Sequence, residues 1–208
     1  SVIDAFVNYH GVKNVDIIAG NFFENNGIDI GTANLINPFM ERSSAITTFK
    51  PLRRVGASIN PYGENWGAHF GFFGSELNNS GTKKYGEGFA SRAHVAVIND
   101  KENSQFLHIG FNNSYRTPDL ENNTMRFSSN GTSDVIGNKV IDTGTITNID
   151  NYMQNMAEFR YQNGSFNLTS EYVKTNVNRV GNNNLEFSGA YVMSSYFLTG
   201  EKYGYDAK

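Results

Sequence analysis

The feature that most constrains the fold of this chain is a regular alternation of short and long connections between predicted strands. Apolar and polar residues alternate with a period of two in nine segments, which is the pattern of half-buried β-strands. Pairs of segments meet at short turns at 10–13, 60–64, 99–103 and 162–164, and the connections between pairs are longer. The predicted strands cover residues 1–10, 14–23, 53–60, 65–74, 88–98, 104–113, 152–161, 165–174 and 185–198.

This rhythm predicts an all-β, antiparallel, up-and-down transmembrane β-barrel. Such barrels have short turns at one rim and long loops at the other, and a tilted strand crosses the membrane in about 9–11 residues. A soluble β-sandwich has no reason to keep all its short turns at one end. The long connections are predicted at 24–52, 75–87 and 114–151, with a medium one at 175–184.

Composition agrees with strands and argues against membrane helices. The chain has 16 phenylalanines, 11 tyrosines and 21 glycines but only 4 prolines, a balance that suits long strands. Mean hydropathy is −0.46 and no apolar run approaches the length of about 18 residues that a membrane helix needs. The net charge of −3 does not predict a nucleic-acid partner.

An odd number of strands conflicts with a closed barrel, since bacterial barrels normally have an even number. We therefore expect residues 1–208 to be one barrel domain that lacks strands at both ends, in agreement with the abrupt start of the strand pattern near Ser1. The alternative is one more short strand within 122–128.

Several short segments of the chain are distinctive. The most specific are Phe39-Met40-Glu41-Arg42 and Tyr196-Phe197-Leu198-Thr199-Gly200-Glu201. The others are Asp4–Tyr9, Gly20–Phe22, Arg53–Gly56 and Met125–Phe127. These segments resemble those of the phosphate-selective porin family, porins O and P, and they occur in the family's order over nearly the whole chain.

The resemblance implies a homotrimer of sixteen-stranded barrels in the bacterial outer membrane, with this chain supplying the middle strands. It also implies that the loop at 24–52 folds into the pore, and that arginine and lysine side chains conduct phosphate or polyphosphate. Outer-membrane lipid and lipopolysaccharide are the other expected partners. Two departures bear on anion selectivity: Glu24-Asn25-Asn26 replaces the family's Glu-Pro-Phe, and Ser128–Gly131 lacks an expected arginine.

Seven cations are candidates for pore lining or anion binding. Arginine grips phosphate through a planar fork and lysine acts as a point charge, and rings of such groups make anion pores. Alternatively they are solvated surface charges, Arg42 pairs with Glu41, or Arg160 and Glu158 only brace the wall. The candidates are Arg42, Lys50, Arg53, Arg54, Arg92, Arg126 and Arg160.

Strand periodicity also assigns faces. Arg92 and Arg160 are predicted to point inward, because an arginine facing lipid at the midplane costs about 2–4 kcal/mol. His69, His94 and His108 share the inward parity, but their spacing does not favour a metal site. Aromatic girdles at the two membrane interfaces are the expected role of Tyr9, Phe22, Trp66, Phe72, Phe111, Tyr152, Tyr161, Tyr191 and Phe197.

The leading functional hypothesis is passive diffusion of small hydrophilic solutes, expected to be anions, with no cofactor, no metal and no enzymatic activity. The first alternative is a surface-exposed barrel that acts as an adhesin or antigen through its long loops. A soluble ligand-binding β-sandwich and a barrel-embedded hydrolase are the others. The sequence has no nucleotide-binding or nucleophile-elbow motif, and it does not group a serine, a histidine and an acid.

Overall fold

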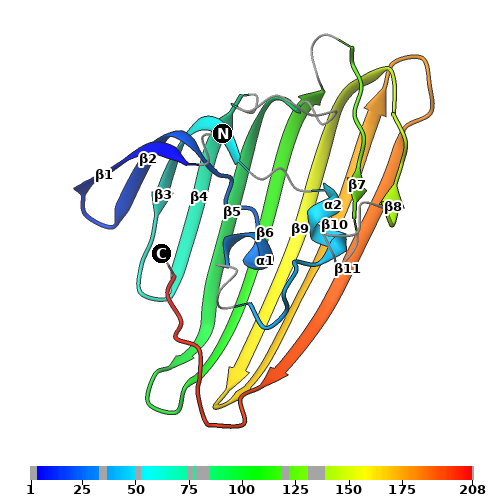
Figure 1. The fold of residues 1–208 in the computed structure, drawn as a ribbon. Coiled ribbons are helices and arrows are strands. Elements are labelled where there is room, and N and C mark those ends of the chain that lie inside the picture. Colours follow the sequence, from blue (N-terminus) through cyan, green and yellow to red (C-terminus); the bar gives the residue numbers. More distant parts are fainter. Residues whose placement is uncertain are drawn as a thin grey trace.

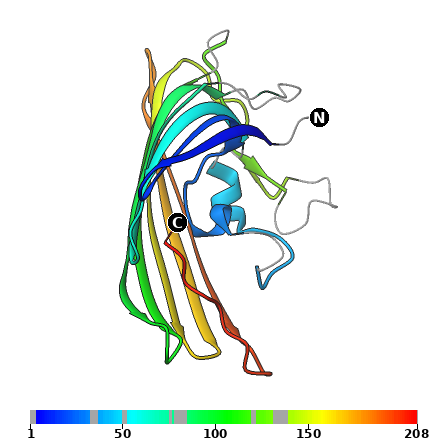
Figure 2. The ribbon, with the colours of Figure 1, turned by 90° about the vertical axis from the view of Figure 1, so that its left-hand side faces the viewer.

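A single curved antiparallel sheet dominates the structure (Figures 1 and 2). The computed structural model describes residues 4–32, 37–49, 53–74, 77, 85–118, 122–130 and 139–207. Nine strands follow one another in the order β1-β2-β3-β4-β5-β6-β9-β10-β11, which confirms the predicted antiparallel sheet of nine strands. They are β1 (Ala5–Val12), β2 (Val15–Phe23), β3 (Arg53–Pro61), β4 (Trp66–Phe73), β5 (Tyr85–Asp100), β6 (Gln105–Pro118), β9 (Ile149–Asn163), β10 (Phe166–Arg179) and β11 (Leu185–Tyr196).

Tight turns join the strands in pairs along one rim, and the longer connections leave from the other (Figure 1). Three of the tight turns contain a residue with positive φ: Asn14 (58°), Ser104 (54°) and Gly164 (57°). Such left-handed positions give a hairpin turn the twist of its flanking strands. The connection between β10 and β11 is shorter than predicted, at 180–184, because β10 continues to Arg179.

The two faces of the sheet have the reverse of the usual distribution of polarity. Side chains on the concave face are polar yet buried, whereas large apolar side chains on the convex face are exposed. A soluble protein buries its apolar face, so this sheet is built to meet an apolar solvent on its outside. The buried polar residues include Gln154, Glu158, Thr169, Glu171 and Thr175, and the exposed apolar ones include Phe70, Phe72, Phe89, Ile109 and Phe111.

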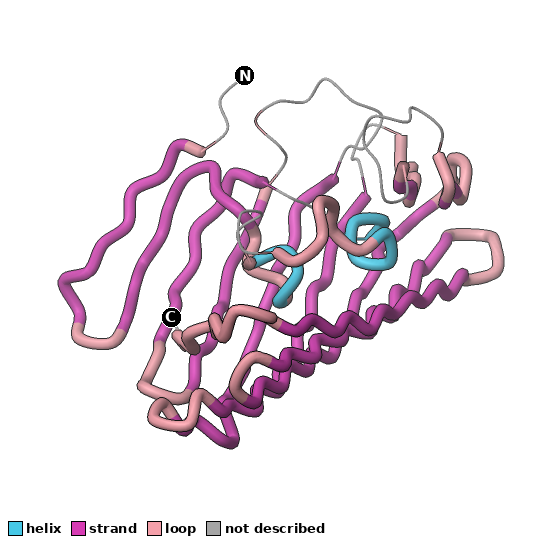
Figure 3. Tube along the Cα trace, turned by 60° about the horizontal axis from the view of Figure 1, so that its bottom comes forward, coloured by secondary structure: helices cyan, strands magenta, loops and turns pink. Residues whose placement is uncertain are grey.

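Segments from two long connections pack against the concave face of β9–β11 (Figures 2 and 3). The first carries helices α1 (Ile28–Gly31) and α2 (Ser44–Phe49), and the second carries the two-stranded pair β7 (Ser128–Ser129) and β8 (Ile141–Asp142). Neither helix is long and apolar enough to cross a membrane, and no other helix occurs in the described part of the chain. The alternative of one more barrel strand within 122–128 is wrong, because Met125 forms only an isolated bridge with Ile146, and β7, which begins at Ser128, pairs with β8 and not with the main sheet.

An apolar core fills the space between these segments and the sheet. Phe127 is fully buried at its centre, with its ring 5.4 Å from Phe49, 5.8 Å from Phe187 and 5.9 Å from Tyr152. The core comprises Ile30, Ile46 and Phe49 from the first segment, Met125, Phe127 and Ile146 from the second, and Ile149, Tyr152, Met156, Val173 and Val177 from the sheet.

The expectation of interfacial aromatic girdles is wrong for three residues. Phe22 and Tyr152 are buried in clusters on the concave side, and the Tyr191 hydroxyl donates a hydrogen bond to inward-facing Glu171. Strand parity cannot distinguish an aromatic ring that faces lipid from one that packs under a loop. Trp66, Phe72 and Phe111 do lie exposed on the convex face, as the prediction requires.

Candidate functional site

A cavity of about 560 Å³ lies between the concave face of the sheet and the segments at 22–32 and 204–206. Three of the predicted cations, Arg42, Arg92 and Arg160, line it, together with His94 and His108. Arg42 comes from the first long connection and the other residues come from β5, β6 and β9, so only the folded chain brings them together. We refer to this space as the arginine cavity.

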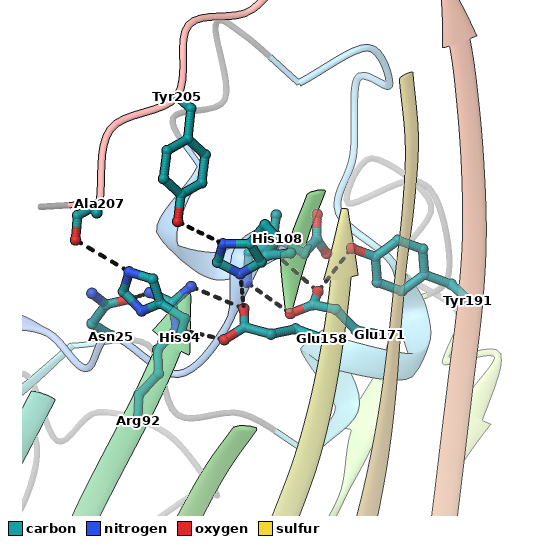
Figure 4. Close-up of polar contacts among 11 residues, drawn as sticks. Asn25, Arg92, His94, His108, Glu158, Glu171, Tyr191, Tyr205 and Ala207 are labelled. Atoms are coloured by element: carbon teal, nitrogen blue, oxygen red, sulfur yellow. Dashed lines mark hydrogen bonds and ion pairs between the residues drawn. The ribbon is translucent and has the colours of Figure 1, made fainter. Parts of the chain in front are cut away.

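The Glu171 carboxylate attaches α1, which borders the cavity, to the sheet (Figure 4). It accepts hydrogen bonds from the backbone N–H groups of Ile28 at 2.7 Å and Asp29 at 3.1 Å. The Tyr191 hydroxyl donates a third at 2.8 Å. Glu171 lies in β10 and is buried, so α1 is attached directly to the strand wall.

Arg42 braces the same segment from its other side. Its Nε donates to the carbonyl of Asp29 at 2.8 Å, and its Nη2 donates to those of Ile30 at 3.3 Å and Thr32 at 3.2 Å. The Asp29 carboxylate accepts from the backbone N–H of Ser43 at 2.9 Å. Burial raises the pKa of Asp29 above its ordinary value, and it outweighs the opposing effects of the Ser43 hydrogen bond and the Arg42 charge.

Arg92 and Glu158 form a buried, bidentate ion pair in the wall of the cavity (Figure 4). The two N–H···O distances are 2.8 and 2.9 Å, and Arg92 also donates to the Asn25 side chain at 2.9 Å. The expected pairing of Arg160 with Glu158 is therefore wrong, because Glu158 reaches across β6 to Arg92 on β5. The charge of Arg92 is largely offset by its partner.

Arg160 is a cation of the cavity wall whose charge is not offset by an ion pair with a described residue. Its guanidinium lies over the ring of Tyr203 at 4.5 Å and that of Phe106 at 5.6 Å. Within the described part of the chain it forms no ion pair. Stacking on aromatic rings fixes the position of a cation without neutralising it.

Three predicted cations do not line the arginine cavity, and a fourth is not described. Arg53 pairs with Asp4 at 2.9 Å, and Arg126 pairs with Asp142 beside β8. Arg54 is fully buried and donates to the carbonyls of Gly74 and Gly86. Lys50 lies outside the described residues.

The histidines do not form a metal centre in the described residues. The rings of His94 and His108 stack at 5.2 Å, and the Tyr205 hydroxyl lies 3.1 Å from His108 Nδ1. His69 lies apart, 2.5 Å from the Asn60 side chain. No group of three or more histidine, cysteine, aspartate or glutamate side chains is placed to hold a metal in the part of the chain that the structure describes.

Sequence reasoning missed the acidic residues that organise the site. The period of two in residues 166–172 places Glu171 on the polar face of its strand, but nothing in this pattern shows that it meets a loop 142 residues away. Glu24, which matches the first residue of the family's Glu-Pro-Phe, pairs with Arg116 in the buried wall. A carboxylate on the inward face of a strand whose other buried inward residues are uncharged was the available signal.

Comparison with known families gives one match. The sequence matches the family model described as "Phosphate-selective porin O and P" over residues 2–208. This span contains every element that lines the arginine cavity. A search of curated proteins gave no match.

Proposed function

The chain belongs to the phosphate-selective porin O and P family, and from this premise we propose that it forms a passive outer-membrane channel for small anions such as phosphate or polyphosphate. Membership implies an anion-selective porin of the outer membrane, and porins are not enzymes. We further propose that the solute is phosphate or polyphosphate and that the sheet closes into a sixteen-stranded barrel. Three such barrels would form a homotrimer surrounded by lipid and lipopolysaccharide.

One observation carries the proposal: Arg42, Arg92 and Arg160 converge on a single cavity beneath a loop attached to the inner wall. An anion that crosses a membrane must shed part of its hydration, and fixed cations at the narrowest point lower that cost. Guanidinium groups suit phosphate because their planar forks match two oxygens at once.

The segment at 24–52 is the proposed constriction. It would narrow the lumen on the side of β9–β11 and leave the arginine cavity as the open passage. Arg42 and Arg160 would supply most of the positive potential, since Glu158 offsets Arg92. The polar concave face provides the wetted wall, and transport needs no energy source or cofactor.

Reconstitution of the complete protein in planar bilayers tests the proposal. We expect discrete conductance steps, a reversal potential that favours chloride over potassium in a salt gradient, and inhibition of chloride current by millimolar phosphate. A folded protein that gives no conductance would contradict the channel and favour the adhesin alternative. Conductance without anion preference would contradict the role given to the arginines.

A further inference from the structure

The contact between Glu171 and α1 has the features of a specific attachment point. Three donors from two different segments meet the two oxygens of one buried carboxylate, and the side chain of Glu171 is 1% exposed. The oxygens of a carboxyl group are acceptors, so the three donors match them. The charged and titratable groups that face Glu171 are Tyr191, Glu158 and Arg92 (Figure 4).

Gly27 allows the loop to approach this carboxylate. Its φ is 142°, a backbone conformation that L side chains rarely adopt. A Cβ at this position would lie 2.4 Å from Glu171 Oε1 and 2.2 Å from the Met156 methyl carbon. The close contact between the loop and β10 therefore depends on both Gly27 and Glu171.

Helix α1 is held by directional contacts in addition to apolar packing. Both helices reach the apolar core, α2 through Ile46 and Phe49 and α1 through Ile30, but α1 also bonds to the wall at Glu171 through its backbone N–H groups. Apolar packing is non-directional, whereas hydrogen bonds to a carboxyl group fix a position. Glu171 therefore fixes where α1, which borders the arginine cavity, meets the wall.

We infer that Glu171 is a positioning residue that latches the constriction loop to the barrel wall and so sets the aperture of the arginine cavity. The inference rests on the proposed function for its effect on transport, but the latch itself is a property of the fold. Loss of the latch frees α1 to leave the wall while α2 stays docked, so the aperture fluctuates. Glu171 touches no solute in this scheme and acts through Ile28 and Asp29.

Thiol labelling tests the latch without reference to conduction. The chain has no cysteine, and Ile30 in α1 is 3% exposed, so an Ile30→Cys variant carries one buried reporter. Adding Glu171→Gln replaces one acceptor oxygen with an NH₂ group that faces a backbone N–H donor. We expect the labelling rate with a charged maleimide to rise by about tenfold, as for loss of a buried hydrogen bond.

Gly27→Ala in the same reporter background disrupts the contact from the loop side. It should raise the labelling rate similarly, even if Glu171→Gln folds poorly. Tyr191→Phe removes one donor of three and should give an intermediate rate. Glu186→Gln is the matched control, because Glu186 is an exposed carboxylate on the outer face of β11 and pairs with Lys174. Unchanged labelling in both Glu171→Gln and Gly27→Ala would overturn the latch.

Single-channel recording tests the consequence for the aperture. Glu171→Gln should add frequent partial closures to the current. The Ala45→Cys/Gly189→Cys pair tethers α2 instead, because a Cβ at Gly189 would lie 3.1 Å from the Ala45 Cβ, near the spacing of about 3.5–4.5 Å in disulfides. Since α2 stays docked in this scheme, oxidation of this pair in the Glu171→Gln background should leave the partial closures in place. Closures abolished by the disulfide would place the motion at α2 and overturn the latch at α1.

The two readouts separate the latch from the channel. Faster labelling in a protein that never conducts would support the latch and contradict the proposed function. A conducting channel whose labelling and current noise are unchanged by Glu171→Gln and Gly27→Ala would contradict the latch and leave the proposed function standing.

Discussion

At the scale of single residues, what distinguishes the cations is their partners. Arg92 and Arg160 share an inward face and one cavity, yet one is locked to a buried carboxylate and the other lies on aromatic rings. Their replacement should therefore have different consequences. Replacing Arg160 should change the anion selectivity of the channel, and replacing Arg92 should change the stability of the folded protein.

Replacing Arg160 by alanine should weaken anion preference with little effect on folding. A unit charge about 8 Å from an ion in water contributes about 0.5 kcal/mol, which changes partitioning about twofold. Reversal potentials in a salt gradient measure the change. Arg126→Ala is the matched control, because Arg126 pairs with Asp142 and does not line the cavity; equal shifts in both variants would contradict the role of Arg160.

Replacing Arg92 by methionine should destabilise the protein by about 3–5 kcal/mol, since it leaves the buried Glu158 without its partner. The double variant Arg92→Met/Glu158→Met should recover most of this loss, because no charge then remains buried. Urea unfolding in detergent, followed by heat-modifiable migration on gels, gives both values. A double variant less stable than the single one would argue against this account.

At the scale of elements, the two long connections stabilise each other as well as the wall. Phe127 lies between α2, β9 and β11, so the long connection that carries β7 and β8 packs on the one that carries α1 and α2. The small β7–β8 pair sits at the edge of this assembly and carries its own ion pair.

Phe127→Ala should loosen both segments, with a cost of about 3–5 kcal/mol for a buried phenylalanine. Limited proteolysis of the folded protein should then cut within 37–49 and 122–149, while the strands stay protected. Phe39→Ala is the control, because Phe39 is exposed in the first segment and its loss should cost no more than about 0.5 kcal/mol. Equal cleavage in the two variants would contradict the shared core.

The β7–β8 pair should respond to acid. The hydrogen bonds from Arg126, and then from the Gly144 backbone, hold the pKa of Asp142 well below its usual range. A carboxyl with a lowered pKa adds stability above the ordinary aspartate pKa and loses it as pH falls through the lowered value. The protection factors of the Phe127 and Thr143 amides, which are exchange rates corrected for the intrinsic effect of pH, should therefore be unchanged from pH 7 to 5 and fall in strong acid. Asp142→Asn should show the lower protection factors already at pH 7.

At the scale of the whole molecule, the convex face should contain a boundary between lipid and water. The central strands span 14–16 residues, more than the roughly 9–11 that cross a bilayer. At the long-loop rim their outermost outward residues are polar, as in the hydrogen bond of 2.7 Å between Asn178 and Asn151. We expect this polar part to project beyond the hydrocarbon.

Arginine scanning of that face tests the boundary. Phe111→Arg places a charge in the apolar band and should destabilise the protein in bilayers by about 2–4 kcal/mol. Asn151→Arg, at the long-loop end of the neighbouring strand β9, should cost about 0–1 kcal/mol. Refolding titrations into lipid vesicles give the two free energies, and equal costs would remove the proposed boundary.

The sequence by itself determined the strands, their antiparallel order and the faces of most of them; β11 is the exception, because its aromatic residues Phe187 and Tyr191 pack inward. Alternation with period two requires no knowledge of distant residues, and hydrophobic residues on one face of each strand fix its register against the next. The inward assignment of Arg92 and Arg160 followed from the same parity and the cost of a charge in lipid. Strand ends were less certain, because the polar extensions of β5, β6, β9 and β10 alternate weakly.

Only the tertiary structure decided which side chains meet. It paired Glu158 with Arg92 instead of Arg160, buried Tyr152 under a loop, and placed Glu171 against backbone amides of α1. The contact of Glu158 with Arg92 spans 66 residues of sequence, and that of Glu171 with Ile28 spans 143. Local periodicity carries no information about such partners, because they depend on where the irregular loops pack against the sheet.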